Sequence, residues 1–170
     1  MDTRHAPESN LTRHPSKGRV RGGSLIRSPE KTLEDKVAAW PNISVHPHRF
    51  GGREFRFNTA EVGHVHIGGI VDIPFPRALR DALLEDQLAE EHHWVPDSGW
   101  TTFRMRTGND LDHALWLLRL SWLRYALKTD SDPHRLFQEE TKILHLNPGL
   151  ASLLARFVPA APSGVATTIS

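Results

Sequence analysis

Two histidines, two residues apart, carry the sharpest chemical signal in the 170-residue chain. His64 and His66 lie in the string EVGHVH at residues 61–66, whose alternation of polar and apolar residues predicts a β-strand. Residues two apart on a strand share a face, so both imidazoles should project to one side while Val65 and Ile67 project to the other. Such a pair supplies half of a divalent metal site, or a metal-free proton acceptor beside a hydrogen-bond donor.

The other half of such a site must come from elsewhere in the chain. Glu91, His92 and His93 lie at the end of the next predicted helix, and a helix that returns antiparallel to the strand would bring this end near His64. We therefore expect the catalytic residues to be the histidine pair of the strand together with His92 or His93, and the sequence leaves open which of these two faces the site. As metal ligands, the expected set is His64, His66 and His93. The alternative is a pair of partly buried histidines that bond only to backbone carbonyls or water.

Three further residues are candidates for a ligand pocket around these histidines. Asp72 would orient an imidazole through its carboxylate, or it would cap the helix expected to begin near residue 76. Trp94 and Trp100 would supply flat apolar walls suited to a small aromatic molecule, or they would fill the core. A second His-x-His pair at residues 46–48 is interrupted by a proline, and we expect it in a loop.

The elements that must position these residues follow from the hydrophobic pattern. A long helix is expected over residues 110–128, because apolar residues recur at intervals of three and four along two sides of it. Those two sides pack into the core and under a helical segment at 136–157, or one of them forms a homodimer face. The other expected elements are a helix over 32–40, a strand through Phe55 and Phe57, a hairpin turn at 58–60, a strand over 61–71, a helix from about 76 to 91 and a strand over 100–106.

This order of helix-strand-strand-helix-strand-helix, followed by a C-terminal helical segment, predicts an α+β fold. In such a fold a small antiparallel sheet is covered by helices. The chain should divide into a disordered basic N-terminal arm at residues 1–31, an α+β domain at 32–128, a C-terminal helical extension at 129–158 and a flexible tail at 159–170.

Composition and missing motifs exclude several classes of protein. A net charge of +1 with 38% hydrophobic residues argues against a generally basic nucleic-acid binder, and the absence of cysteine excludes thiolate chemistry. No stretch is apolar enough for a membrane span or a signal peptide, so we expect no membrane partner and a cytoplasmic location. The chain also lacks a glycine-rich phosphate loop, a G-x-S-x-G elbow and an H-E-x-x-H helix, which removes nucleotide hydrolysis, serine hydrolysis and zincin proteolysis.

Three strings in this order resemble the luciferase domain family, the domain type of the fungal luciferases: GHVHIGGIVDIPFP, EEHHWVPDSGWTTFRM and DLDHALWLLRLSWLRYAL. The resemblance covers residues 47–128 and makes 32–128 a luciferase-like domain. It carries the family's histidine pair to His64 and His66, and its downstream histidine to His92 or His93. In the fungal members the implied reaction adds molecular oxygen to a hydroxylated pyrone without a flavin. The sequence around Gly68 and Gly69 departs from the fungal pattern, and we do not expect bioluminescence.

Two functions therefore remain open. The first is a histidine-dependent oxidoreductase that uses molecular oxygen on a small aromatic or enolic compound, with a divalent metal as an optional cofactor. The second is a non-catalytic module that binds a small ligand or assembles as a homodimer through the helix at 110–128.

Overall fold

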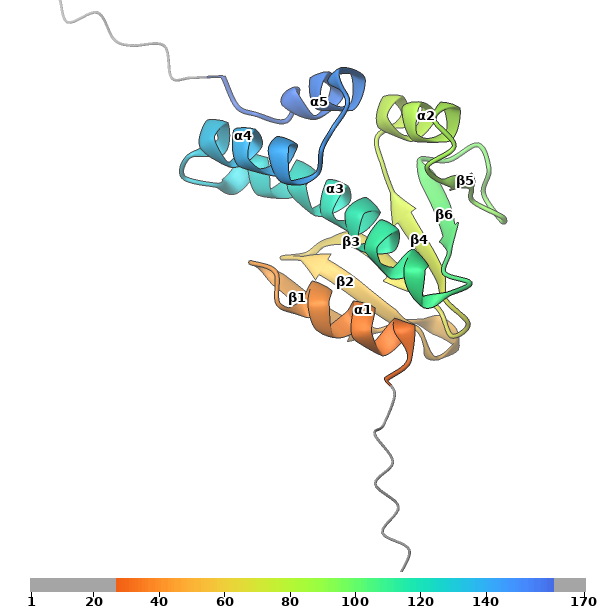
Figure 1. Ribbon diagram of the computed structural model, residues 1–170. Helices are drawn as coiled ribbons and strands as arrows, with labels where there is room; N and C mark the ends of the chain where they lie inside the picture. The colour runs from red at the N-terminus through yellow and green to blue at the C-terminus, as the bar shows by residue number, and fades with distance from the viewer. Residues whose placement is uncertain (1–26, 161–170) are drawn as a thin grey trace, which may run out of the picture.

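The structure, a computed structural model, describes residues 27–160 (Figure 1). Within this range the chain forms the following helices and strands: α1 (Pro29–Ala38), β1 (Ile43–Pro47), β2 (Arg53–Phe57), β3 (Ala60–Val65), β4 (Ile70–Pro74), α2 (Arg77–Glu85), β5 (Glu90–Glu91), β6 (Trp100–Arg104), α3 (Leu111–Thr129), α4 (Pro133–Ile143) and α5 (Pro148–Ala155). Helix α1 begins inside the segment expected to be a disordered arm, and the rest of that arm and most of the expected tail lie outside the described residues.

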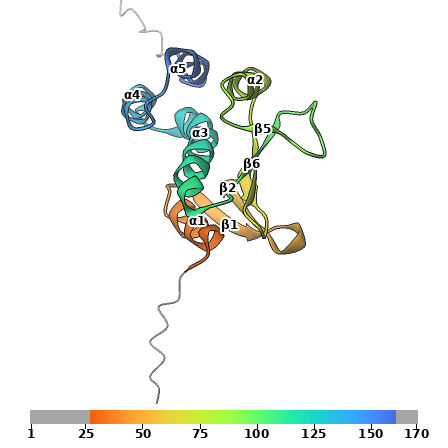
Figure 2. The ribbon, with the colours of Figure 1, turned by 45° about the vertical axis from the view of Figure 1, so that its right-hand side comes forward.

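All the strands join one sheet in the order β1-β2-β3-β4-β6-β5, and every neighbouring pair is antiparallel. Helices α1 and α3 lie on one side of the strands, whereas the loop between β5 and β6 projects on the other (Figure 2). The predicted α+β class, with an antiparallel sheet and helices over it, is confirmed. The described part of the sheet has six strands rather than the three expected, because β1 and β5 were missed and one expected strand is two.

The strand expected over residues 61–71 is two strands, β3 and β4, joined by a tight turn. Gly68 has φ 92° and Gly69 has φ 78°, which are backbone conformations that favour glycine. At Gly69 a side chain is also excluded sterically, because its Cβ would lie 2.5 Å from the carbonyl oxygen of Met105. The glycine pair therefore reverses the chain and lays β4 antiparallel against β3.

The first strand, β1, was predicted as a loop because Pro47 interrupts it. Pro47 is its last residue, and β1 is at the edge of the sheet, where a missing backbone donor is tolerated. The short strand β1 brings His46 opposite Glu54 of β2.

Helix α2 is shorter than expected, and this changes the path of the chain after it. The helix ends at Glu85, and Gln87 adopts a left-handed conformation with φ 56°. The residues expected in its last turn form β5, in which Glu90 and Glu91 pair with β6. The segment that carries His92 is therefore held by the sheet and not by a helix end.

The core lies between one face of the sheet and α3. Val65, Val71 and Ile73 of the sheet are at most 2% exposed, and α3 packs across β3 and β4. Helix α4 lies along the other side of α3 (Figure 1), so both apolar sides of α3 are covered within the chain. A homodimer face on α3 stays a prediction, but it is no longer needed to explain why α3 is apolar on two sides.

Helices α4 and α5 confirm the helical segment expected at the C-terminal end of the fold. None of the helices between residues 27 and 160 combines the length and the apolar character that a bilayer crossing demands.

Gly63 marks a close approach between α3 and the sheet. A Cβ at this position would lie 2.7 Å from Cδ2 of Leu118 and 2.9 Å from the carbonyl oxygen of Asp72. We expect Gly63→Ala to lower the free energy of unfolding by about 1–3 kcal/mol, the usual cost of overpacking a core. Urea unfolding at equilibrium measures this change. Gly108→Ala is the matched control, since a Cβ there meets no described atom within 4 Å; an equal loss in both variants would contradict the packing argument.

Candidate functional site

A row of polar side chains crosses the face of the sheet that points away from α3. In an antiparallel sheet, residues directly opposite one another project to the same face. Gly63, the neighbour of His64 on β3, faces α3, so His64 and the rest of the row point to the other side of the sheet. Its members, in order across the sheet, are His46 of β1, Glu54 of β2, His64 of β3, Asp72 of β4 and Thr102 of β6.

Asp72 is the centre of this row and is only 1% exposed. Its Oδ1 accepts a hydrogen bond of 2.5 Å from the hydroxyl of Thr102. Its Oδ2 faces three Nε2 atoms, at 3.4 Å from His64, 3.2 Å from His66 and 3.6 Å from His92. Even so, no group within residues 27–160 donates a well-aligned hydrogen bond to this Oδ2. Three imidazoles thus converge on one buried carboxylate oxygen.

The alternative role considered for Asp72, a cap for the next helix, is wrong. Helix α2 has Pro76 at its N-cap position, and no side chain caps it. The predicted orientation of an imidazole by Asp72 agrees with the geometry, and the carboxylate contacts more imidazoles than the sequence suggested.

His64 is held between two carboxylates. Its Nδ1 lies 2.6 Å from Oε1 of Glu61, and its Nε2 faces Asp72. Burial opposes the charged imidazole, but the acidic partners Asp72 and Glu61 outweigh burial and raise the pKa of His64 to about 9. Burial also opposes the carboxylate of Asp72, yet the contact with His64 and the hydrogen bond from Thr102 lower its pKa to about 2. In the metal-free protein at neutral pH, the pair is therefore an imidazolium and a carboxylate.

His66 and His92 differ from His64 in their charge. Burial and repulsion from His64 lower the pKa of His66. Burial also lowers the pKa of His92, with further repulsion from His93 and His64, although Asp72 works in the opposite direction. Both imidazoles are neutral at pH 7, so each keeps one nitrogen with a free lone pair.

The tautomer of His92 follows from its backbone contacts. Its Nδ1 lies 3.2 Å from the backbone N–H of Trp94 and 3.3 Å from that of Val95, and it accepts from both. A neutral imidazole that accepts at Nδ1 carries its proton on Nε2. His92 therefore presents an N–H toward Asp72 and the cleft, and its lone pair is used by the loop.

His92 faces Oδ2 of Asp72 at 3.6 Å, and His93 also has a ligand atom within 4.8 Å of Asp72. The His92 residue is buried, whereas His93 is exposed and stacks on the outer side of His92 with ring centroids 4.8 Å apart. The structure places His93 with Asp72 and not with the histidine pair of β3: among the described residues, ligand atoms lie within 4.8 Å of one another in the groups His48, His64 and His66; Asp72, His92 and His93; and His48, Glu54 and Glu61.

Sequence reasoning missed His48, which follows β1 and reaches the site. Its ring stacks on that of His64 with centroids 3.9 Å apart and planes inclined by 15°. Its Nδ1 lies 3.7 Å from Oε2 of Glu54, which is itself buried and paired with Arg56. The string at residues 46–48 repeats the His-x-His spacing, and that spacing is the signal that would have found His48.

The cluster opens into a cleft of about 260 Å³ on this face of the sheet. Besides the cluster itself, Arg49, Trp94, Val95 and Trp100 line the cleft. The ring of Trp100 lies 5.3 Å from that of His64, and Trp94 is 67% exposed at the mouth. The alternative in which Trp94 fills the core is therefore wrong, and both tryptophans stand where a wall of the cleft was expected.

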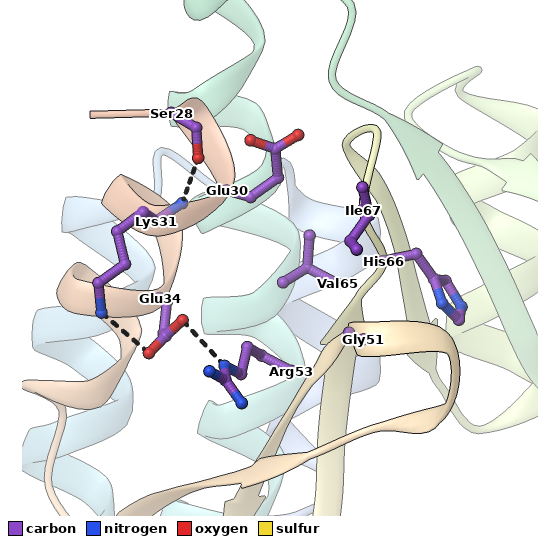
Figure 3. Close-up of a pocket in the computed structure, with 10 residues that line it drawn as sticks. Ser28, Glu30, Lys31, Glu34, Gly51, Arg53, Val65, His66 and Ile67 are labelled. Carbon is purple, nitrogen blue, oxygen red and sulfur yellow. Dashed lines mark hydrogen bonds and ion pairs between the residues drawn. The ribbon is translucent and has the colours of Figure 1, made fainter. Parts of the chain in front are cut away.

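A second cavity, of about 340 Å³, lies where α1 begins and β3 turns into β4 (Figure 3). An ion-pair chain borders it, with Lys31 Nζ 3.0 Å from Oε1 of Glu34 and Arg53 Nε 3.3 Å from Oε2 of Glu34. The ring of His66 points away from this chain (Figure 3). Val65 and Ile67 both line this cavity, and Ile67 is 76% exposed in the turn.

Two arginines of α2 fix the loop that carries His92 and the Trp94 wall. Arg80 is buried, and it donates to the carbonyl oxygen of Pro96 and lies 3.3 Å from Glu91. Arg77 donates to the carbonyl oxygen of Asp97 over 2.6 Å. Sequence reasoning missed this role, because the contacts with the loop are mainly to backbone carbonyls.

The comparisons with known proteins agree with the predicted resemblance. The family model of the luciferase domain matches residues 59–121 of the chain. This segment runs from the turn before β3 into α3 and carries the three imidazoles of the cluster, Asp72 and both tryptophans. No curated protein matches the chain, and no solved structure matches it.

The His64–Asp72 pair predicts a pH dependence of stability in buffer that contains a chelator. The raised pKa of His64 stabilises the fold fully below the ordinary imidazole value near 6.5, and this contribution is lost as the pH rises through about 9. The free energy of unfolding should therefore fall between these pH values, as urea unfolding at a series of pH values measures. The slope should flatten in His64→Gln; an unchanged slope in that variant would contradict the assignment.

Arg80 should matter more for the loop than Arg77. Arg80→Met keeps the aliphatic stem but removes a buried donor to Pro96, which we expect to cost about 1–3 kcal/mol of unfolding free energy. Arg77→Met removes an exposed contact and should cost less. Thermal and urea unfolding of both variants provide the measurement, and a larger loss in Arg77→Met would argue against the loop anchor described above.

Proposed function

We propose that this luciferase-domain protein is an oxidoreductase that adds molecular oxygen to a small aromatic or enolic compound without a flavin. The observation that carries the proposal is the convergence of His64, His66 and His92 on Asp72 at the floor of a cleft with tryptophan walls. The reaction implied by the family needs a group that takes a proton from the substrate and groups that hold the negative oxygen left behind.

The histidine cluster supplies these groups. A neutral imidazole accepts the hydroxyl proton of the bound compound, and His66 suits this role because His64 and His92 have their Nδ1 atoms engaged by Glu61 and by the loop. The Nε2–H of His92 then donates to the negatively charged oxygen. The electron-rich carbon of the enolate gives its electrons to molecular oxygen, one carbon–oxygen bond forms, and the proton returns to give a hydroperoxide. Substrate and oxygen together equal the product, so no other oxidant or reductant is required.

The size and walls of the cleft support a small flat substrate. A volume of about 260 Å³ is slightly below the usual range of roughly 300–1,000 Å³ for ligand pockets. A compound of one or two rings fits such a space, and the ring of Trp100 offers a flat surface beside the imidazoles.

A substrate test separates this enzyme from a binding module. Purified protein is supplied with hydroxypyrones or related enolic aromatics, and oxygen uptake and product are followed. We expect kcat/KM to fall at least about 100-fold in His66→Ala, the usual loss when a general base is removed. His46→Ala is the control, because His46 lies at the far end of the row and bonds to Ser44. Binding without oxygen uptake in the wild type, or equal turnover in wild type and His66→Ala, would overturn the proposal.

A further inference from the structure

We propose that His64, His66 and Asp72 form a three-ligand site for a divalent transition-metal ion, with its open side toward the cleft. The inference rests on the proposed function, because it assigns to the same cluster a cofactor that would hold the substrate oxygen. It differs from the ligand set expected from the sequence, since a carboxylate replaces His93.

The two distances from Oδ2 of Asp72 to His64 and His66 match those between atoms that share an ion. Two ligands at about 2.1 Å from one ion lie about 3.0 Å apart at a right angle and about 3.4 Å apart at the tetrahedral angle. Oδ2 of Asp72 lies 3.2 Å from Nε2 of His66 and 3.4 Å from Nε2 of His64. The three side chains come from paired positions of β3 and β4 and the turn between them, so the backbone fixes their spacing.

The unsatisfied oxygen of Asp72 is a second, independent observation. A carboxylate oxygen with almost no exposure requires a donor or a cation. Oδ2 accepts no well-aligned hydrogen bond within residues 27–160, and the Nε2 of the charged His64 lies 3.4 Å away, although Oδ1 of the same group is hydrogen-bonded to Thr102. An ion between Oδ2 and the two imidazoles would satisfy this oxygen.

The surroundings of His64 match those of a metal ligand. A histidine that binds a metal through Nε2 usually donates its Nδ1–H to a carboxylate, which fixes the tautomer and the ring. Nδ1 of His64 lies 2.6 Å from Oε1 of Glu61, as this arrangement requires. Two further carboxylates, Glu61 and Glu54, lie near the cluster, and their negative charge favours a cation there.

His92 is excluded as a ligand by its tautomer. Its Nδ1 accepts backbone hydrogen bonds, so its Nε2 carries the proton and has no lone pair to offer a metal. It is instead a donor beside the ion, directed toward the oxygen of a ligand bound there. The inference is therefore specific: of the three histidines in the cluster, His64 and His66 bind the ion and His92 does not.

Two imidazoles and one carboxylate with open positions form the donor set of non-haem iron oxygenases, and zinc, cobalt and manganese accept the same donors. The proposed site therefore suits a protein that brings an enolic oxygen and molecular oxygen together. In the loaded protein Nε2 of His66 would bind the ion and would no longer accept the substrate proton there; the ion would instead favour loss of that proton and stabilise the deprotonated oxygen of the substrate.

Cobalt binding tests the proposal directly. The full chain is purified without a histidine tag, treated with a chelator and titrated with Co²⁺ alone under calorimetry and visible absorption, and Zn²⁺ is used in competition. We expect one ion per chain with ligand-field bands in the wild type. Asp72→Asn, His64→Ala and His66→Ala should each weaken binding by more than about 100-fold, since the loss of an outer partner alone costs about 10–100-fold.

His92→Ala is the matched control within the cluster and should keep the ion and its absorption bands, as should the distant His46→Ala. Circular dichroism checks that each variant is folded. A wild type that takes up no stoichiometric Co²⁺ overturns the proposal, as does His92→Ala losing the ion as fully as His66→Ala. Turnover of an enolic substrate by chelator-treated wild type that binds no ion overturns the metal site and leaves the proposed function standing. Stoichiometric binding of the ion without any turnover supports the metal site and overturns the proposed function.

Discussion

A carboxylate buried in the middle of a sheet must be compensated by its neighbours, and Asp72 imposes this constraint on the whole face around it. Thr102 satisfies one oxygen from the next strand, and imidazoles from the other side converge on the second. The charge of Asp72 keeps His64 protonated, and Glu61 completes that pair from the mouth of the cleft. Much of the local chemistry therefore follows from one buried negative charge.

The sheet can hold a buried carboxylate because its two faces have different roles. One face packs against α3 and supplies the apolar core, which leaves the other face free for polar side chains. Strand register then aligns those side chains across the sheet. The loop after β5 closes one side of the cleft, and Arg80 of α2 fixes that loop to a helix outside the site. A rigid sheet positions the cluster, and loops shape the space above it.

The sequence could predict what depends on local period. The two-residue spacing of His64 and His66 placed both on one face, and helical periodicity located α3. Which strands pair with one another could not be predicted from the sequence. The expected strand continued through Gly68 and Gly69 because alternation runs on across a tight turn, and β1 was missed because only its edge position makes Pro47 harmless. The choice of His92 required β5, a two-residue strand that exists only through its pairing with β6.

The segment that matches the family model begins just before β3 and so leaves out β1 and β2. Taken alone, that segment would turn β3 into an edge strand with a row of open backbone donors and acceptors, a surface that invites aggregation. It would also lose Phe55 and Phe57, which are buried in the core. The matched segment is thus smaller than the unit that builds the sheet and its core. A fragment cut to residues 59–121 is therefore a poor substitute for the whole chain in a test of independent folding.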